Sequence, residues 1–438
     1  MPKTEIFYYL LYFLMVALFI TGPALPDITL TLFIILTIIH KRNFIYKINE
    51  AWIILLLLLW LWFIFISFFA YNFEKSIKDA IIFLRFILFI ILSVFVFKDI
   101  KENLIKVLLY FILLCCVFVS LDSLYQFYNY SYSEGFGTDI FGRSPDGLYG
   151  RLSGPFADLV PGSYLSRLLF FIIILYALNL KKIEDNYYYN YLIYISLSLI
   201  LSVIYFSGER MALATSFLGY LICLIFTKDL RKIIIISSII SFCFILININ
   251  FHPHYKNIKI INSTAFHEGL IIERTIECDN VNECTKRFKV QPKFLEVLKN
   301  FDKSAYGEIY MSAFHMWSKY KFTGIGLNNY NIVCENEPEF KKYNKKFGCT
   351  SHPHNLYIQA LTETGIFGLI LFIITICAIL YKINLNNEKN IKYPLISAYL
   401  TIFWPIMSTG SFLKNWNMVF ICFVISLCII ISRTKKLD

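Results

Sequence analysis

Charged side chains are scarce in this sequence of 438 residues, and their scarcity excludes a soluble globular protein. Only 16% of the residues are charged, whereas 58% are hydrophobic. Apolar runs of about 20 residues, long enough to cross a bilayer at 1.5 Å per residue, recur along the chain. Because lipid offers no partners to backbone polar groups, each run is predicted to be an α-helix.

The chain also lacks internal repeats and a signal-peptide cleavage pattern. The missing repeats argue against a transporter, which commonly has two related halves. The first apolar segment continues into residues 22–27 without a small-x-small sequence, so we expect no cleavable signal peptide.

We therefore predict an all-α polytopic membrane protein with about twelve spans. The expected spans are residues 5–21, 25–39, 51–70, 78–97, 104–127, 162–180, 188–206, 210–227, 232–250, 356–381, 393–410 and 415–433. They divide into a membrane domain at 1–250 with nine helices, a long loop at 251–355, and a membrane domain at 356–438 with three helices. A shorter outer loop is expected at about 128–161.

The net charge of +11 follows the expected topology, so we expect no nucleic-acid partner. Basic residues cluster after every second span. The clusters lie at 41–47, 98–106, 181–182, 228–232, 382–392 and 433–436. The positive-inside rule assigns these connections and both termini to the cytoplasm and the two outer loops to the other side.

Four of the eleven cysteines lie in the long outer loop, and the other seven lie in apolar segments. An oxidising compartment favours the pairs Cys278–Cys284 and Cys334–Cys349, although four cysteines allow three connectivities or four free thiols. The same loop has helical spacing of apolar residues at about 304–322, broken by residues 323–330. It is therefore expected to be a partly helical lid on the membrane domain.

A polar cluster occupies residues 351–368, where the long loop re-enters the membrane. If Asn355 opens the helix, then Asn355, Gln359, Thr362 and Glu363 form one polar stripe. Such a stripe is costly against lipid, so we expect it to face the protein interior or a wet cavity.

Two histidines precede this stripe, His352 and His354. A histidine at this boundary can be neutral near pH 7 and accept a proton from a hydroxyl. The alternative is that both histidines are interfacial residues that cap the start of the helix. A metal site formed by the two histidines is disfavoured, because no carboxylate lies at a useful spacing from them. Glu363 lies about two and a half turns from His354 on the opposite side of the helix, so its partner is expected elsewhere.

Arginines provide candidate anion contacts at the outer surface and inside the membrane. Arg210 follows Glu209 at a helix start, where a cation opposes the helix dipole unless an anion such as a pyrophosphate is bound. Arg210 can equally snorkel or pair with Glu209. Arg151 and Arg167 either bind phosphate or sugar or are solvated. Arg85, inside the fourth expected span, either helps to hold an anionic lipid or forms a structural ion pair.

With these residues in view, the chain resembles the O-antigen ligase and polymerase superfamily of bacterial membrane enzymes over essentially its whole length. The signature is His354-Asn355-x-Tyr357-x-Gln359-x-x-x-x-Glu363-x-Gly365-x-x-Gly368. Arg210 falls where the family carries an essential arginine, and the segment from Gly324-x-Gly326 to Tyr330 resembles the Gly-x-Gly segment that precedes the histidine.

The resemblance implies metal-independent, cofactor-free, inverting transfer of an undecaprenyl-pyrophosphate-linked glycan at the periplasmic face of the inner membrane. The acceptor would be lipid A-core in a ligase, which we favour, or another lipid-linked repeat in a polymerase; a glycan transporter is the less favoured reading. His354 would deprotonate or align the acceptor, and Arg210 would stabilise the pyrophosphate. The expected substrate-binding residues are Arg151, Glu209, His352, Asn355, Gln359, Glu363 and Arg85.

The chain departs from the resemblance at one point. Ligase-like members often carry another arginine near the Gly-x-Gly segment, where this chain has Asn331 and, upstream, Glu308. That role is unfilled or falls to Arg151.

Overall fold

The computed structural model describes most of the chain. The described residues are 3–40, 49–131, 135–145, 151–180, 187–255, 259–262, 270–278, 281–290, 297, 299–340 and 348–433. For the strands between 259 and 290 only the backbone is considered.

The predicted all-α polytopic fold is confirmed, and each expected span corresponds to one helix. These helices are α1 (Lys3–Leu18), α2 (Ala24–His40), α3 (Ala51–Ser67), α4 (Phe73–Val96), α5 (Glu102–Tyr128), α6 (Pro161–Leu178), α8 (Tyr187–Phe206), α9 (Arg210–Phe226), α10 (Arg231–Phe251), α15 (Leu356–Asn384), α16 (Lys389–Phe403) and α17 (Asn415–Ser432). Among the described residues, seven of them are long and apolar enough to cross a membrane: α4, α5, α6, α8, α10, α15 and α17.

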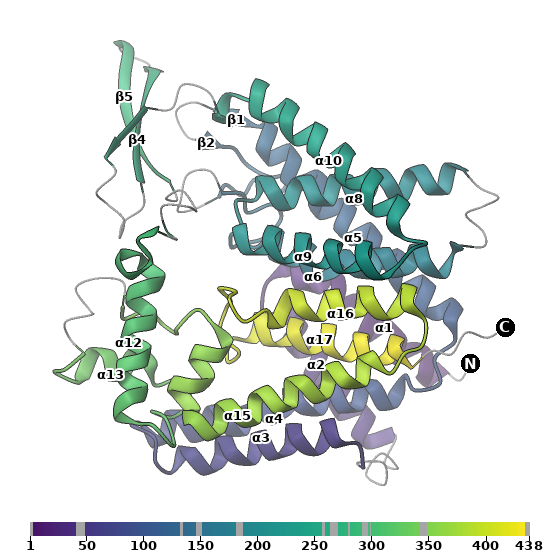
Figure 1. Ribbon diagram of the computed structural model, residues 1–438, viewed down its shortest axis with the longest axis vertical. Coiled ribbons are helices and arrows are strands. Elements are labelled where there is room, and N and C mark those ends of the chain that lie inside the picture. Colours follow the sequence, from purple (N-terminus) through teal and green to yellow (C-terminus); the bar gives the residue numbers. More distant parts are fainter. Residues whose placement is uncertain are drawn as a thin grey trace.

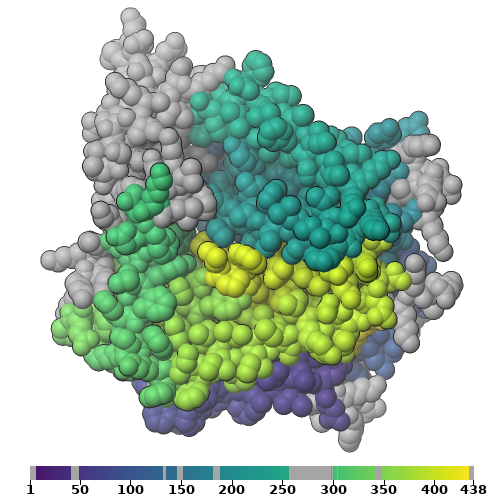
Figure 2. Space-filling view, in the orientation of Figure 1, coloured from purple at the N-terminus to yellow at the C-terminus, as the bar shows by residue number. Residues whose placement is uncertain are grey.

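The helices run alongside one another, with both chain termini at one end of the bundle (Figure 1). At the opposite end lie two short helices of the long loop, α12 (Ala305–Lys319) and α13 (Tyr330–Asn336) (Figure 1). The centre is formed by α6 and α17, the most buried of the long apolar helices. In Figure 2, α15 and α16 form a band between α9 and α10 on one side and α3 on the other.

One predicted span ends earlier than expected. The segment 393–410 was expected to be helical throughout, but α16 ends at Phe403 and Trp404 has an extended backbone. Pro405 is the physical reason, because its ring disfavours helical geometry in the residue before it. We call the irregular stretch from 404 to 414 the outer connector, because it leads directly into α17.

The long loop contains the expected helix, and also a sheet that the sequence analysis did not predict. Ser304 caps α12 by accepting a hydrogen bond from the Gly307 amide at 3.0 Å. The sheet consists of antiparallel β3 (Lys259–Asn262), β4 (Leu270–Cys278) and β5 (Val281–Val290), in that order. A small antiparallel pair, β1 (Tyr130–Ser131) and β2 (Gly135–Phe136), follows α5.

A second hydrophobic core, separate from that of the membrane helices, lies under α12 and α13. Its buried members are Ile309, Ala313, Met316, Ile325, Tyr330, Val333, Cys334 and Phe340. The lid is therefore a packed unit with its own interior, held against the bundle by α12, which packs on α15.

Candidate active site

Helix α15 is broken one-third of the way along its length. Gly365 has φ 71° and ψ −177°, a conformation that interrupts the helix. The carbonyls of Thr362 and Glu363 accept hydrogen bonds from the amides of Ile325 and Gly326, each at 3.0 Å. The Ile366 amide donates to the Lys321 carbonyl, also at 3.0 Å. The segment 321–328 thus satisfies the backbone groups that the break exposes.

Glycine is required on both sides of this contact. A Cβ on Gly365 would overlap the Phe322 carbonyl oxygen, and a Cβ on Gly324 would lie 2.5 Å from the Glu363 carbonyl carbon. Both glycines also have positive φ. The Gly-x-Gly segment is therefore shaped to enter the break in α15.

The same segment ties the break to the turn between α3 and α4 and to the first two turns of α4. The Leu327 amide donates to the Ser76 hydroxyl at 3.0 Å, and the Asn328 side chain donates to Asp79 at 2.7 Å. The Ile325 carbonyl accepts from the Tyr71 amide at 3.0 Å. Three parts of the chain that are far apart in sequence thus meet at one rigid point.

Asn355 begins α15, as the sequence analysis expected. Its side-chain oxygen accepts from the amides of Tyr357 and Ile358, at 2.9 and 3.1 Å. Its amide group donates to the carbonyls of Pro405 and Met407, at 2.8 and 3.1 Å. Both ends of the amide are occupied, so Asn355 holds the outer connector against the start of α15.

The predicted polar stripe faces the protein interior. Asn355, Gln359, Thr362 and Glu363 are all buried. Gln359 donates to Glu363 at 3.2 Å and to the Ser411 hydroxyl at 2.8 Å. Glu363, the last member of the stripe, therefore has a partner one turn away on the same helix. Through Ser411, the stripe also joins α15 to the outer connector.

His354 lies immediately before this helix in a strained backbone conformation. Its φ is 53°, and its carbonyl accepts from the Thr409 amide at 2.8 Å. Burial lowers the pKa of His354, and the charge of Lys414 lowers it further. The imidazole is therefore neutral near pH 7 and able to accept a proton.

The ring of His352 packs against the ring of His354. The two rings are 4.2 Å apart, and the Nδ1 atom of His352 is 2.9 Å from the Ser351 hydroxyl. Burial is the main cause that lowers the pKa of His352 to about 3, with smaller contributions from His354 and Lys414. A ring that stays neutral and 4% exposed is suited to packing more than to proton transfer.

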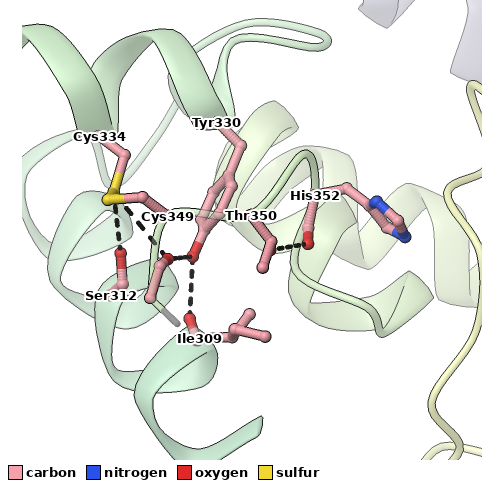
Figure 3. Close-up of a disulfide and its surroundings, with 8 residues drawn as sticks. Ile309, Ser312, Tyr330, Cys334, Cys349, Thr350 and His352 are labelled. Atoms are coloured by element: carbon pink, nitrogen blue, oxygen red, sulfur yellow. Dashed lines mark hydrogen bonds between the residues drawn. A yellow bond between two sulfur atoms is a disulfide. The ribbon is translucent and has the colours of Figure 1, made fainter. Parts of the chain in front are cut away.

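The predicted disulfide between Cys334 and Cys349 is present and anchors the segment that leads to the histidines (Figure 3). The Cα atoms of the two cysteines are 5.6 Å apart. Beside it, the Tyr330 hydroxyl lies 3.0 Å from the Ile309 carbonyl and 2.7 Å from that of Gly348. The other predicted pair, Cys278–Cys284, falls on side chains outside the described part of the chain.

Glu209 is bound to the start of α6. Its carboxylate accepts hydrogen bonds from the amides of Gly162 and Ser163, at 2.6 and 3.1 Å, and from the Ser163 hydroxyl. A carboxylate at a helix N-terminus is favourable because it faces the positive end of the helix dipole. Glu209 thus fixes the turn before α9 and, with it, the position of Arg210.

Arg210 presents a half-buried guanidinium that has no hydrogen bond or ion pair to any described residue. Its electrostatic neighbours are the Tyr306 side chain and a second guanidinium, that of Arg151. Arg151 donates to the Leu159 carbonyl at 2.7 Å, and its buried Nε has no hydrogen-bond partner among the described groups. Two neighbouring cations repel each other, and an anion bound beside them removes that cost.

Tyr306, at the start of α12, links this pair of arginines to the histidines. Its ring meets the ring of His354 edge-on, with centroids 6.1 Å apart, and its side chain also interacts with Arg210. Neither Tyr306 nor Lys414 was predicted from the sequence to belong to the site. The predicted helix at 304–322 places Tyr306 near its start, but nothing in the sequence shows that this turn lies over α9 and α15.

Arg85 lies apart from this group. Its guanidinium forms an ion pair with Asp27 at 3.0 Å and donates to the side-chain oxygen of Asn415 at 2.9 Å. The structural ion pair was one of the two predicted alternatives. No contact within the described residues joins Arg85 to Arg210 or His354.

Part of the chain matches a known protein family. The family described as O-antigen ligase matches residues 195–373, from α8 to α15. No curated protein matches the sequence significantly. The matched region contains Arg210, Tyr306, the Gly-x-Gly segment and His354. Multi-pass membrane proteins of this family carry out ligase- or polymerase-type reactions on lipid-linked glycans. The match thus identifies residues 195–373 as similar to the O-antigen ligase family, in agreement with the resemblance seen in the sequence.

Proposed function

We propose that this protein transfers an undecaprenyl-pyrophosphate-linked glycan onto lipid A-core at the periplasmic face of the bacterial inner membrane. The observation that carries the proposal is the arrangement of Arg210, Tyr306 and His354. An unpaired guanidinium beside a second one is suited to a pyrophosphate, and a neutral imidazole near them is suited to a hydroxyl.

In the proposed reaction, a hydroxyl oxygen of the acceptor attacks the anomeric carbon of the donor glycan. The bond from that carbon to the pyrophosphate oxygen breaks, and its electron pair leaves with undecaprenyl pyrophosphate. The hydroxyl proton moves to the neutral ring of His354. Attack from the face opposite the leaving group inverts the anomeric centre.

The charge that develops on the leaving pyrophosphate is stabilised by Arg210 and Arg151. Preorganised cations of this kind need no reorganisation during the reaction, which makes them effective catalysts. Because pyrophosphate is already a good leaving group, positioning and charge stabilisation suffice without a metal or cofactor.

The remaining predicted site residues act as positioning groups in this proposal. Glu209 holds Arg210 through the start of α6, and His352 packs against His354. Asn355, Gln359 and Glu363 are buried and fix α15 to the outer connector. Both ends of the Asn355 amide are used within the protein, whereas the Oε1 atoms of Gln359 and Glu363 have no hydrogen-bond partner among the described residues.

The proposed orientation places residues 251–355 in the periplasm as a loop between two membrane domains, 1–250 and 356–438. Both termini then lie in the cytoplasm. Basic clusters after every second helix support this orientation, as does the position of both termini at the end of the bundle away from α12 (Figure 1).

The test is the glycan profile of a deletion strain complemented with wild type, His354→Ala or Arg210→Ala. We expect both variants to lose at least about 100-fold in product, the contribution typical of a general base or a charge-stabilising group. Matched controls are His315→Ala, an exposed histidine on α12, and Arg231→Ala at the start of α10, which should both retain activity.

The profile also separates the ligase from its alternative. Core-only lipopolysaccharide with accumulated undecaprenyl-linked chains identifies a ligase, whereas core bearing one repeat without a ladder identifies a polymerase. Normal glycan from both variants at native protein levels would contradict the proposed function.

A further inference from the structure

A cavity of about 230 Å³ lies between α4 and the beginning of α17. Its polar lining is Asp79, Arg85 and Asn415, and its apolar lining includes Phe83 and Phe86. We call it the α4 cavity. Its volume is many times that needed for one water molecule, so it can hold a group as large as a sugar ring.

The α4 cavity opens toward the surface that faces lipid. Ile82 is part of its lining and is 38% exposed, and the preceding residue, Ile81, which does not line it, is 58% exposed. A ligand carried on a lipid can therefore enter from the side, without passing through the arginines of the candidate active site.

The charges of the α4 cavity disfavour a pyrophosphate. Among the lining residues Asp79 is a carboxylate, and the one cation, Arg85, is already paired with Asp27 behind it, so the lining carries no free positive charge. Asn415 bridges this ion pair: its side-chain oxygen accepts a hydrogen bond from Arg85, and its side-chain amide donates one to Asp27 at 3.2 Å. Carboxylates and amides beside phenyl rings are suited to a sugar, whose hydroxyls donate and accept and whose ring is amphipathic.

Polar atoms in this cluster are left without partners. The Nε of Arg85 and the Oδ1 of Asp27 are buried, and neither has a hydrogen bond within the described part of the chain. Groups of this kind are costly unless a ligand or water completes them. The ion pair therefore stabilises the wall of the cavity and still has unused hydrogen-bonding capacity.

The outer connector and the first residue of α17 separate the α4 cavity from His354. On one side, Thr409 donates to the His354 carbonyl and the charge of Lys414 acts on the His354 ring. On the other side, Leu413 and Asn415 line the cavity. A sugar in the α4 cavity would thus lie one chain segment away from the proposed base.

We propose that the α4 cavity binds the sugar end of the acceptor glycolipid, while the donor pyrophosphate binds at Arg210 and Arg151. This inference rests on the proposed function, because it divides the two substrates of that reaction. The division follows charge: the anionic pyrophosphate goes to Arg210 and Arg151, two cations with one carboxylate, Glu209, near them, and the terminal sugar goes to the cavity with paired charges.

The experiment replaces Ile82 with the photo-crosslinking residue p-benzoylphenylalanine in cells that make the full glycan. The matched control carries the same residue at Ile81, which does not line the cavity. After illumination, the captured lipids are identified by mass spectrometry. We expect Ile82 to capture lipid A-core in addition to phospholipid, and Ile81 to capture phospholipid alone.

A second substitution tests whether the cavity's polar groups cause the capture. Asp79→Asn in the Ile82 crosslinking protein should reduce lipid A-core capture by about tenfold, the effect of one lost hydrogen bond, with phospholipid capture unchanged. Capture of phospholipid alone at both positions, or of a polyprenyl-pyrophosphate glycan in place of lipid A-core, overturns the inference.

The outcome is separable from failure of the proposed function. If His354→Ala retains normal transfer but Ile82 still captures lipid A-core, the proposed chemistry fails and the acceptor site stands. If His354→Ala is inactive and Ile82 captures only phospholipid, the chemistry stands and the site fails.

Discussion

Replacing Gly365 by alanine tests the contact between the break in α15 and the segment 321–328. Gly365 has φ 71° and ψ −177°, a region of backbone conformation that only glycine adopts without strain. An added Cβ would also overlap the Phe322 carbonyl oxygen. The variant therefore suffers backbone strain and is forced to move the segment away from the helix.

The expected magnitude follows from these two costs. Backbone strain contributes about 1–3 kcal/mol. Displacing the segment loses the three backbone hydrogen bonds made by Ile325, Gly326 and Ile366, at about 1 kcal/mol each. The total is about 4–6 kcal/mol, a large fraction of the stability of most folded domains.

Gly22 provides a matched control for the strain alone. It has φ 104° and ψ −167°, close to the conformation of Gly365, but a Cβ there meets no atom within 4 Å. Gly22→Ala should therefore lose only the strain energy, leaving a difference of about 3 kcal/mol between the two variants.

Thermal unfolding of the purified variants in detergent, followed by size-exclusion chromatography, measures this difference. Gly365→Ala should unfold at a clearly lower temperature than Gly22→Ala, and it should lose glycan transfer even where protein remains in the membrane. Equal unfolding temperatures for the two variants would refute the argument that the segment 321–328 fits against the break.

Three other predictions concern the groups around the histidine. In Lys414→Ala the pKa of His354 should rise, because a nearby cation is removed. Since His354 must be neutral to accept a proton, the acid limb of the pH–rate profile should move to higher pH. The shift should be less than about one pH unit, because Lys414 is exposed. Tyr306→Phe should lower transfer about tenfold or more by removing a hydroxyl beside Arg210. Tyr320→Phe at the other end of the same helix, assayed in parallel, should change transfer less than about threefold. Serine at both positions of the Cys334–Cys349 disulfide, which closes a loop of sequence separation 15, should destabilise the lid by about 3 kcal/mol, measured by its protease sensitivity; unchanged sensitivity would contradict the anchoring role.

The membrane fold was predictable because its signal is local. Each span is a continuous apolar run, and a run of that length in lipid has few alternatives to a helix. The exception at the end of α16 has a local cause as well, because Pro405 disfavours a helical conformation at Trp404 and so ends the helix at Phe403. The β3–β5 sheet did not follow from the sequence, because β4 and β5 lack the regular alternation of apolar and polar residues that indicates a half-buried strand.

The candidate site was predictable only in part, because its geometry depends on contacts between distant segments. The stripe that begins with Asn355 followed from helical spacing, and its burial from the cost of polar groups in lipid. The break at Gly365 did not follow, since the amides that satisfy it come from residues about 40 positions earlier. Tyr306 was missed for the same reason, because its neighbours belong to α9 and to the segment before α15.

These contacts explain why so many polar residues lie close together in the signature of α15. A continuous helix satisfies its own backbone, but a broken one needs external partners, and the Gly-x-Gly segment provides them. Once that segment is fixed, Asn328 holds the α4 cavity wall through Asp79, and Gln359 holds the outer connector through Ser411. The break in α15 therefore sets the distance between the proposed acceptor cavity and His354, and the residues that maintain the break matter to transfer without touching either substrate.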